Sequence, residues 1–276
     1  MKNVCVITGG GSGMGLAAAK YLPKEKIVVL SGRTVKKLEN AVAELTALGY
    51  EARAHACDTS DRASVRDLAE YVASLGNIKN VINAAGLSPA MAKPEQLLRV
   101  NALGTVYVNQ EFSRLMNAGS VIVDVSSNSS YVLPSFLVSK RTYQLAETDE
   151  ALFLKKLMQK SNLPKGAYQK SGFAYALSKN FVVWYAAKCA FAYGKKGIRV
   201  VSLSPGLIAT DMGNLEAAEG GSLIHYAAEE RMGTAEELGF ALAMVADERN
   251  GYLAGVDILC DGGSTNGKRE FKRQLK

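Results

Sequence analysis

Short apolar runs, many of them rich in β-branched residues, alternate with longer stretches of helical periodicity along most of the chain. The runs are apolar throughout, which is typical of strands that are covered on both faces of a sheet. Seven runs are predicted to be strands: Asn3 to Ile7, Lys26 to Leu30, Ala52 to Ala56, Asn80 to Asn83, Ser120 to Val125, Ile198 to Leu203 and Val256 to Leu259. Six stretches are predicted to be helices: near Gly15 to Leu22, Val35 to Leu48, Arg62 to Leu75, Pro94 to Met116, Tyr175 to Tyr193 and Ala235 to Asp247. This alternation predicts a doubly wound, Rossmann-type α/β fold, with a parallel sheet of about seven strands and helices on both faces.

One segment, residues 128–172, interrupts the alternation. It holds no predicted strand, although residues 149–160 would form a basic amphipathic helix with Leu152, Phe153, Leu157 and Met158 facing inward. A long segment without regular structure inside a compact domain is usually functional or mobile. Because no internal repeat and no Pro- or Gly-rich linker divides the chain, we expect a single domain over residues 1–276 with an insertion at about 128–172.

Composition narrows the class of protein further. The 276 residues are 48% hydrophobic and 21% charged, so the chain can bury a core without disulfides or metal. The four cysteines are far apart in the sequence, which favours reduced thiols over a disulfide framework, and two histidines argue against a multi-histidine metal site. A strand that begins at Asn3 leaves no room for a signal peptide, and no apolar run reaches membrane-spanning length. We therefore expect a cytoplasmic protein with no membrane, metal or nucleic-acid partner.

The net charge of +7 allows two interpretations. It could attract an anionic ligand such as a phosphorylated cofactor, or it could reflect a solvated lysine-rich surface. Much of the excess lies in residues 155–170 and in a basic C-terminal tail at about 264–276, and blocks of like charge are usually exposed. No basic motif interleaved with aromatic residues points to nucleic acid.

A glycine-rich loop follows the first predicted strand and opens the first predicted helix: Thr8-Gly9-Gly10-Gly11-Ser12-Gly13-Met14-Gly15. Small residues there permit a tight turn and let the backbone approach a pyrophosphate at the helix N-terminus. A P-loop would need lysine where Leu16 stands, and a nucleophile elbow would need glycine where Met14 stands. The loop therefore indicates a dinucleotide site, with a plain turn as the alternative.

The end of the second strand bears on which dinucleotide is bound. An NAD site usually has an acidic residue here to hold the ribose 2′-hydroxyl, but Gly32 and Arg33 follow Ser31. An arginine can bind a 2′-phosphate with a charge-assisted pair of hydrogen bonds, and Ser31 and Thr34 could add hydroxyl donors. NADP(H) is therefore favoured over NAD(H), and the alternative is that Arg33 only caps the next helix.

Further motifs follow in a definite order along the chain: Asp58-Thr59, Asn83-Ala84-Ala85-Gly86, Arg99-Val100-Asn101-Ala102, Val123-Asp124-Val125-Ser126-Ser127, Tyr175-Ala176-Leu177-Ser178-Lys179, Pro205-Gly206-Leu207-Ile208-Ala209-Thr210 and Asp261-Gly262-Gly263. Together with the glycine loop they resemble the motifs of the short-chain dehydrogenase/reductase family over nearly the whole chain, with Ile82 in place of the first asparagine of its N-N-A-G segment. A Y-x-x-x-K pattern alone occurs by chance in many helices. Its place after a serine-ended strand and before a Pro-Gly segment makes coincidence improbable.

The resemblance implies an oxidoreductase that moves hydride between NADP(H) and a ketone or secondary alcohol. Tyr175 would exchange a proton with the substrate oxygen, Ser127 would hold that oxygen, and Lys179 would hold the nicotinamide ribose. Residues four apart share one helix face, and a nearby ammonium lowers the pKa of a phenol from its usual value near 10. Asn101 would anchor a water in a proton relay from Lys179. The resemblance assigns the cofactor to Gly9, Ser12, Gly13, Met14, Gly15, Ser31, Arg33, Thr34, Asp58, Thr59, Asn83, Ala84, Gly86, Tyr175, Lys179, Pro205, Gly206, Ile208 and Thr210.

The chain departs from the family pattern between Ser127 and Tyr175, which are 48 positions apart (175 − 127). Tyr143 and Tyr168 are poorer candidates for the catalytic tyrosine, because neither is followed by lysine four residues later. We hypothesise that the insertion forms a helical flap over the substrate pocket and alters the homo-oligomer, a dimer or tetramer. Some steroid-acting members of the family have an enlarged segment at this point, so the resemblance makes a steroid or bile acid a candidate substrate. The alternative is a surface excursion with no substrate role.

Two other functions remain open from the sequence. A catalytically silent NADP-binding sensor or scaffold would keep this fold but would tend to lose the tyrosine or the lysine. A nucleotide-sugar epimerase or dehydratase shares the Y-x-x-x-K chemistry but would normally add a C-terminal substrate domain, and only a short basic tail follows Gly263.

Overall fold

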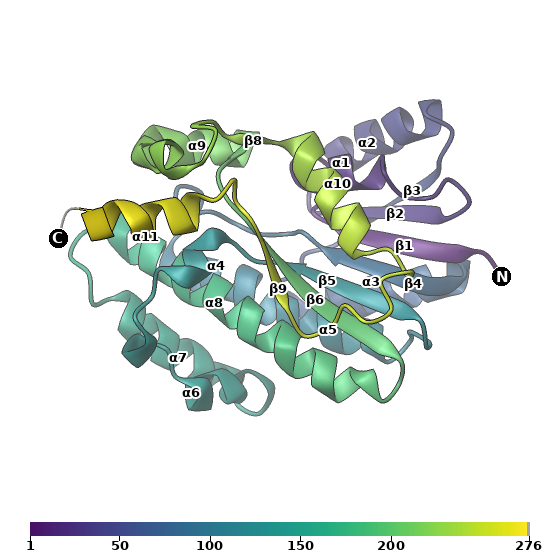
Figure 1. The fold of residues 1–276 in the computed structure, drawn as a ribbon. Coiled ribbons are helices and arrows are strands. Elements are labelled where there is room, and N and C mark those ends of the chain that lie inside the picture. Colours follow the sequence, from purple (N-terminus) through teal and green to yellow (C-terminus); the bar gives the residue numbers. More distant parts are fainter. Residues whose placement is uncertain (275–276) are drawn as a thin grey trace.

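The computed structural model describes residues 1–274, which form a seven-stranded sheet with helices on both of its faces (Figure 1). The strands are β1 (Asn3–Thr8), β2 (Ile27–Gly32), β3 (Glu51–Ala56), β4 (Asn77–Asn83), β5 (Ser120–Val125), β6 (Ile198–Pro205) and β9 (Asp257–Cys260). Their order is β3-β2-β1-β4-β5-β6-β9, and every pairing is parallel. The predicted doubly wound fold is confirmed, and each predicted strand is present within a few residues of its expected bounds.

The strand order reverses next to β1, because β2 and β3 extend the sheet on one side while β4, β5 and β6 extend it on the other. The loops that follow β1 and β4 therefore diverge at the carboxyl edge of the sheet. Such a point opens a crevice in which α/β proteins bind their ligands.

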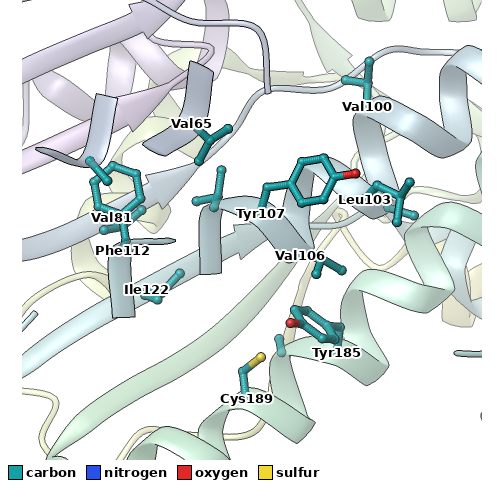
Figure 2. Packing of buried hydrophobic residues seen from close by; sticks show 14 of the residues in the cluster. Val65, Val81, Val100, Leu103, Val106, Tyr107, Phe112, Ile122, Tyr185 and Cys189 are labelled. Atoms are coloured by element: carbon teal, nitrogen blue, oxygen red, sulfur yellow. The ribbon is translucent and has the colours of Figure 1, made fainter. Parts of the chain in front are cut away.

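Apolar helix faces cover both sides of the sheet. The cluster on one side is built with α1 (Gly13–Ala19), α2 (Val35–Ala47) and α10 (Ala235–Val245). The other side is covered by α3 (Arg62–Leu75), α5 (Gly104–Ser113) and α8 (Ala167–Gly194). Figure 2 shows this second core, where Phe112 of α5 meets Val81 and Ile122 of the sheet and Tyr185 and Cys189 approach from α8.

The segment predicted to be irregular is mostly helical. It contains α6 (Lys140–Gln144) and α7 (Glu150–Ser161), with short 3₁₀ turns at Asn128–Tyr131, Ser135–Leu137 and Leu145–Glu147. Helix α8 begins at Ala167, eight residues before the predicted start at Tyr175. The expected amphipathic helix is present as α7, with Phe153, Leu154 and Leu157 buried.

Other differences lie near the carboxyl edge of the sheet. The predicted helix 94–116 is α4 (Pro94–Leu98), a π-helical turn at Arg99–Leu103, and α5. Four further elements were not predicted: β7 (Ile208–Ala209), β8 (Gly233–Thr234), α9 (Asp211–Gly220) and a 3₁₀ turn at Gly221–Tyr226. The expected basic tail forms α11 (Ser264–Gln274), which lies beside α9 beyond the strand ends in Figure 1. Among residues 1–274, no helix combines the length and apolarity needed to cross a membrane.

Candidate active site

A cavity of about 500 Å³ opens at the carboxyl edge of the sheet, where the loops after β1, β4, β5 and β6 meet. Ten of the residues predicted for the site line it: Met14, Ala84, Gly86, Ser127, Tyr175, Lys179, Pro205, Gly206, Ile208 and Thr210. Motif residues up to 196 positions apart in the sequence (210 − 14) therefore line the same cavity. Its volume is typical of a small-molecule site.

Close backbone packing explains the glycines of the loop after β1. A β-carbon on Gly9 would lie 2.9 Å from the backbone of Ala84, and one on Gly15 would lie 2.6 Å from the Gly9 carbonyl oxygen. Gly9 and Gly13 also have φ values of +68° and +57°, which side chains rarely adopt. The loop is thus a bare backbone cradle next to the cavity, with Met14 as its lining residue.

Basic side chains gather at the end of β2, beside this loop. Arg33 and Thr34 are exposed there, and the Thr34 hydroxyl does not cap α2. Lys37 is a residue that the motifs did not single out. A β-carbon built on Gly11 would lie 3.4 Å from its Cβ atom. Ser31, by contrast, is fully buried next to the Cys57 thiol, so a hydrogen bond from its hydroxyl to a 2′-phosphate stays a prediction.

Tyr175 and Lys179 lie one turn apart on α8, in the wall of the cavity. The Lys179 Nζ atom is 5.8 Å from the centroid of the Tyr175 ring and donates a hydrogen bond to the Val125 carbonyl oxygen at 2.9 Å. The Ser126 hydroxyl donates to the Lys179 carbonyl oxygen at 2.7 Å. The end of β5 thus fixes both the backbone and the side chain of Lys179, which is only 5% exposed.

Ser127 follows β5 and also lines the cavity. Its Oγ atom accepts a hydrogen bond from the Ser129 backbone N–H at 3.2 Å, which holds the start of the next 3₁₀ turn. The Ser126 hydroxyl is occupied by Lys179, so Ser127 is the better placed of the two serines to meet a ligand.

Asn101 lies behind the cavity wall in the π-helical turn and is 1% exposed. Its Oδ1 atom accepts from the Leu87 N–H at 2.9 Å, and its Nδ2 atom donates to the Leu87 carbonyl at 2.9 Å and to Ser178 Oγ at 3.3 Å. Gly86 separates Asn101 from Lys179, since a β-carbon there would lie 3.3 Å from Asn101 Oδ1 and 3.5 Å from Lys179 Nζ. The structure therefore brings Asn101 close to Lys179 but commits both of its amide hydrogens to protein atoms.

The remaining predicted residues support the site from outside the cavity. The Asp58 carboxylate accepts from the backbone and hydroxyl of Ser60, and the Thr59 carbonyl packs against Gly104. Asn83 is buried, accepts from the Thr8 hydroxyl at 2.9 Å and donates to Asp124 at 2.9 Å. Burial raises the pKa of Asp124 to about 6, although Asn83, Asn109 and the Lys179 charge oppose the change.

Apart from the Asp261-Gly262-Gly263 motif, nothing in the sequence indicated the far wall of the cavity. Cys260, Asp261 and Ser264 line it from β9 and the start of α11, together with Ile224 and Ala227. Asn128 Nδ2 donates to Ser264 Oγ at 3.2 Å, which ties α11 to the loop after Ser127. The apparent tail had no apolar periodicity to indicate that it packs here.

Most of the insertion at residues 128–172 lies away from the cavity. Among the described residues from 128 to 174, Asn128 alone lines the cavity, and α7 packs against α8 and α4. The hypothesis of a helical flap over the pocket is therefore wrong for α6 and α7, which lie on the outer side of α8 in Figure 1.

At the cavity rim, Arg231 forms ion pairs with Glu229 at 2.6 Å and Glu237 at 2.8 Å. The hydrogen bond from Arg231 holds the pKa of Glu237 at about 2. Because two carboxylates neutralise the Arg231 guanidinium, this cation does not offer a binding site for an anion at the rim.

Sequence and structure comparisons agree on the family. The family model for short chain dehydrogenases matches residues 3–139, and the model described as enoyl-(acyl carrier protein) reductase matches residues 159–265. A short-chain dehydrogenase/reductase, bsc3, of Alternaria brassicicola is 29% identical over 95% of this chain and 96% of its own length. Human carbonyl reductase [NADPH] 1 is 28% identical over 79% of this chain and 86% of its own length.

Among solved structures, a short chain dehydrogenase from Burkholderia cenocepacia in complex with NADP has a similar fold. The TM-score is 0.74 and the identity is 23%, over 94% of this chain and 96% of that one. The fold is of the Rossmann type, with the cavity at the topological switch of the sheet. The chain belongs to the short-chain dehydrogenase/reductase family.

Proposed function

We propose that this chain is an NADP(H)-dependent enzyme that transfers hydride between the nicotinamide and a ketone or secondary alcohol. One observation carries the proposal: Tyr175 and Lys179 lie one turn apart on the cavity wall, and Ser127 lines the same cavity from the end of β5. The resemblance of the motifs assigns the proton-transfer roles to these three side chains.

Residues at the cavity would hold the dinucleotide. The loop at Gly9, Gly13 and Gly15 would present bare backbone to a pyrophosphate, and it can do so only with glycine, because side chains there would collide with the neighbouring backbone or need an unfavourable φ. Lining residues continue from Met14 past Gly86 to Pro205 and Thr210. The bound cofactor supplies or accepts the hydride.

The chain's own residues would handle the proton. In reduction, the Tyr175 hydroxyl donates its proton to the carbonyl oxygen while the Ser127 hydroxyl holds that oxygen by a hydrogen bond. The Lys179 ammonium favours the phenolate that remains, since opposite charges attract in a buried site. General acid–base help of this kind contributes about 10² to 10⁴ in rate.

The apolar lining supports a bulky apolar substrate, such as a hydroxysteroid or a bile acid. Leu87, Leu207 and Ile224 line the cavity, and the nearest cation at the rim, Arg231, is matched by two carboxylates. We propose a reducing compartment such as the cytoplasm, because the four cysteines are free thiols. A homodimer or tetramer could use exposed apolar side chains of α8 and α10, such as Phe191 and Phe240.

The preference for NADP(H) rests on the cations at the end of β2. Arg33 follows β2, where an acidic residue would otherwise hold a 2′-hydroxyl, and Lys37 of α2 lies beside Gly11 of the glycine loop; both are exposed. The Burkholderia protein in complex with NADP and the relative named for NADPH support the same preference.

Consumption of NADPH and of NADH with a panel of sterols, bile acids, quinones and small keto-acids tests the proposal. We expect turnover of apolar cyclic ketones with NADPH. Lys37→Gln should raise the KM for NADPH roughly tenfold and leave the KM for NADH unchanged, because it removes one charge-assisted hydrogen bond. Lys36→Gln is the matched control, since Lys36 pairs with Glu39 at 3.7 Å. Preference for NADH, or equal effects of the two substitutions, would refute the cofactor assignment.

A further inference from the structure

A carboxylate lies buried behind the catalytic lysine. Asp124 is in β5, three residues before Ser127, and it is 0% exposed. It does not line the cavity, and none of the roles proposed above uses it. A buried ionisable group in an apolar strand is costly unless its environment compensates for the lost hydration.

Two asparagines hold this carboxylate. Asn83, its register partner in β4, donates from Nδ2 to Asp124 Oδ1 at 2.9 Å. Asn109 of α5 donates from Nδ2 to both carboxylate oxygens, each at 2.9 Å. These amide donors fix the position of the carboxylate. Because the amides are neutral, they do not neutralise its negative charge.

The cation whose charge acts on Asp124 is Lys179. Its Nζ atom binds the carbonyl of Val125, the residue that follows Asp124, and its charge favours the ionised form of Asp124. The Cys189 thiol of α8, labelled in Figure 2, also interacts with Asp124. Burial raises the pKa of this thiol to about 12, so it stays neutral. Since the pKa of Asp124 is about 6, the carboxylate is ionised at neutral and alkaline pH.

We propose that Asp124 is a positioning residue that acts through Lys179. Its carboxylate is the buried counter-charge that keeps the ammonium against the end of β5 and offsets part of the positive field at Tyr175. In this way Asp124 sets the pH range in which Tyr175 exchanges its proton. The inference rests on the proposed function, because it assigns the field of Lys179 to the titration of Tyr175.

The test is the pH dependence of alcohol oxidation in Asp124→Asn. Asparagine keeps the shape of the side chain, and a turn of the Asn109 amide can present its Oδ1 atom, which has no hydrogen-bond partner among the described residues, to the new amide. Without the negative charge, the ammonium favours the phenolate more strongly. The midpoint of the rising limb of kcat should therefore move to lower pH by roughly 0.5–1 unit.

Glu111→Gln is the matched control. Glu111 is also a buried carboxylate, 3% exposed on α5, but Arg62, Arg66 and Arg114 neutralise it. Its loss should leave the midpoint unchanged. NADPH binding and thermal unfolding of both variants establish that they are folded. A midpoint that stays in place in folded Asp124→Asn, or moves to higher pH, overturns the inference.

A second readout separates this inference from the proposed function. The titration of the Tyr175 phenol can be followed without substrate as the absorbance at 295 nm that is lost in Tyr175→Phe. This titration is measured once in the original chain and once in a chain that carries Asp124→Asn. If no carbonyl compound is turned over but this titration moves to lower pH in Asp124→Asn, the proposed function fails and the charge coupling stands. If turnover is observed and neither midpoint moves, the inference about Asp124 fails alone.

Discussion

At the scale of single residues, the site side chains divide into those that meet the cavity and those that support it. The order of the motifs was sufficient to predict that Ser127, Tyr175 and Lys179 line one cavity, because the family resemblance assigns them to one site. It did not predict that Ser31 would be buried beside Cys57 or that Asn101 would bind the backbone of Leu87. Such roles depend on which neighbour fills the remaining hydrogen-bond positions, and a motif does not specify that neighbour.

The buried carboxylate of Asp124 should make stability depend on pH. Its pKa is raised from 3.8 to about 6 in the folded chain, so between these values the folded state holds a proton that the unfolded state has lost. Stability from this group is therefore greatest below pH 4 and falls as the pH rises to 6.

The contribution lost is on the order of 3 kcal/mol, since one unit of pKa corresponds to ~1.4 kcal/mol. Other carboxylates contribute with the opposite sign, so the comparison is with Asp124→Asn. Urea unfolding at pH 4.5 and at pH 7 measures the free energy of unfolding of Asp124→Asn and of the original chain. The value for Asp124→Asn minus the value for the original chain should be more positive at pH 7 than at pH 4.5. A difference independent of pH would contradict the raised pKa.

At the scale of elements, periodicity predicted the strands and most helices but not the early start of α8 or the helix α11. The predicted start at Tyr175 left Gly172 outside the helix, yet α8 runs through Gly172, where a β-carbon would meet nothing within 4 Å. Helix α11 is polar along most of its length and is held by a few contacts, such as the ring contact of Tyr226 with Phe271. Contacts of this kind leave no periodic signal.

Helix α7 of the insertion contributes to the core rather than to the cavity. Leu157 is 0% exposed, and Phe153 packs on Phe181 of α8 with ring centroids 5.1 Å apart. Leu157→Ala should therefore lower the free energy of unfolding by about 2–5 kcal/mol and leave the KM for the carbonyl substrate unchanged. Leu163→Ala, at a position 65% exposed, is the control and should change stability by less than about 0.5 kcal/mol. Denaturant unfolding measures both, and a changed KM in folded Leu157→Ala would restore the idea of a flap.

At the scale of the whole molecule, alternation of strands and helices predicted a doubly wound sheet, whereas the strand order had to come from the structure. The reversal beside β1 brings residues 8–15, 83–86, 125–128 and 205–210 to one edge. Helix α8 then crosses this edge and brings Tyr175 and Lys179 to the same place. The site is thus a consequence of the topology, and the insertion adds α7 to the layer that packs on α8.

The most direct test of the account is the comparison of turnover and NADPH binding in Tyr175→Phe. Loss of the hydroxyl should lower kcat by about 10² to 10⁴ while the Kd for NADPH stays within a few-fold. Tyr168→Phe on the same helix, outside the cavity lining, should keep both values. Full turnover by Tyr175→Phe, or absence of carbonyl turnover in the original chain despite tight NADPH binding, would contradict the assignment of proton transfer to Tyr175.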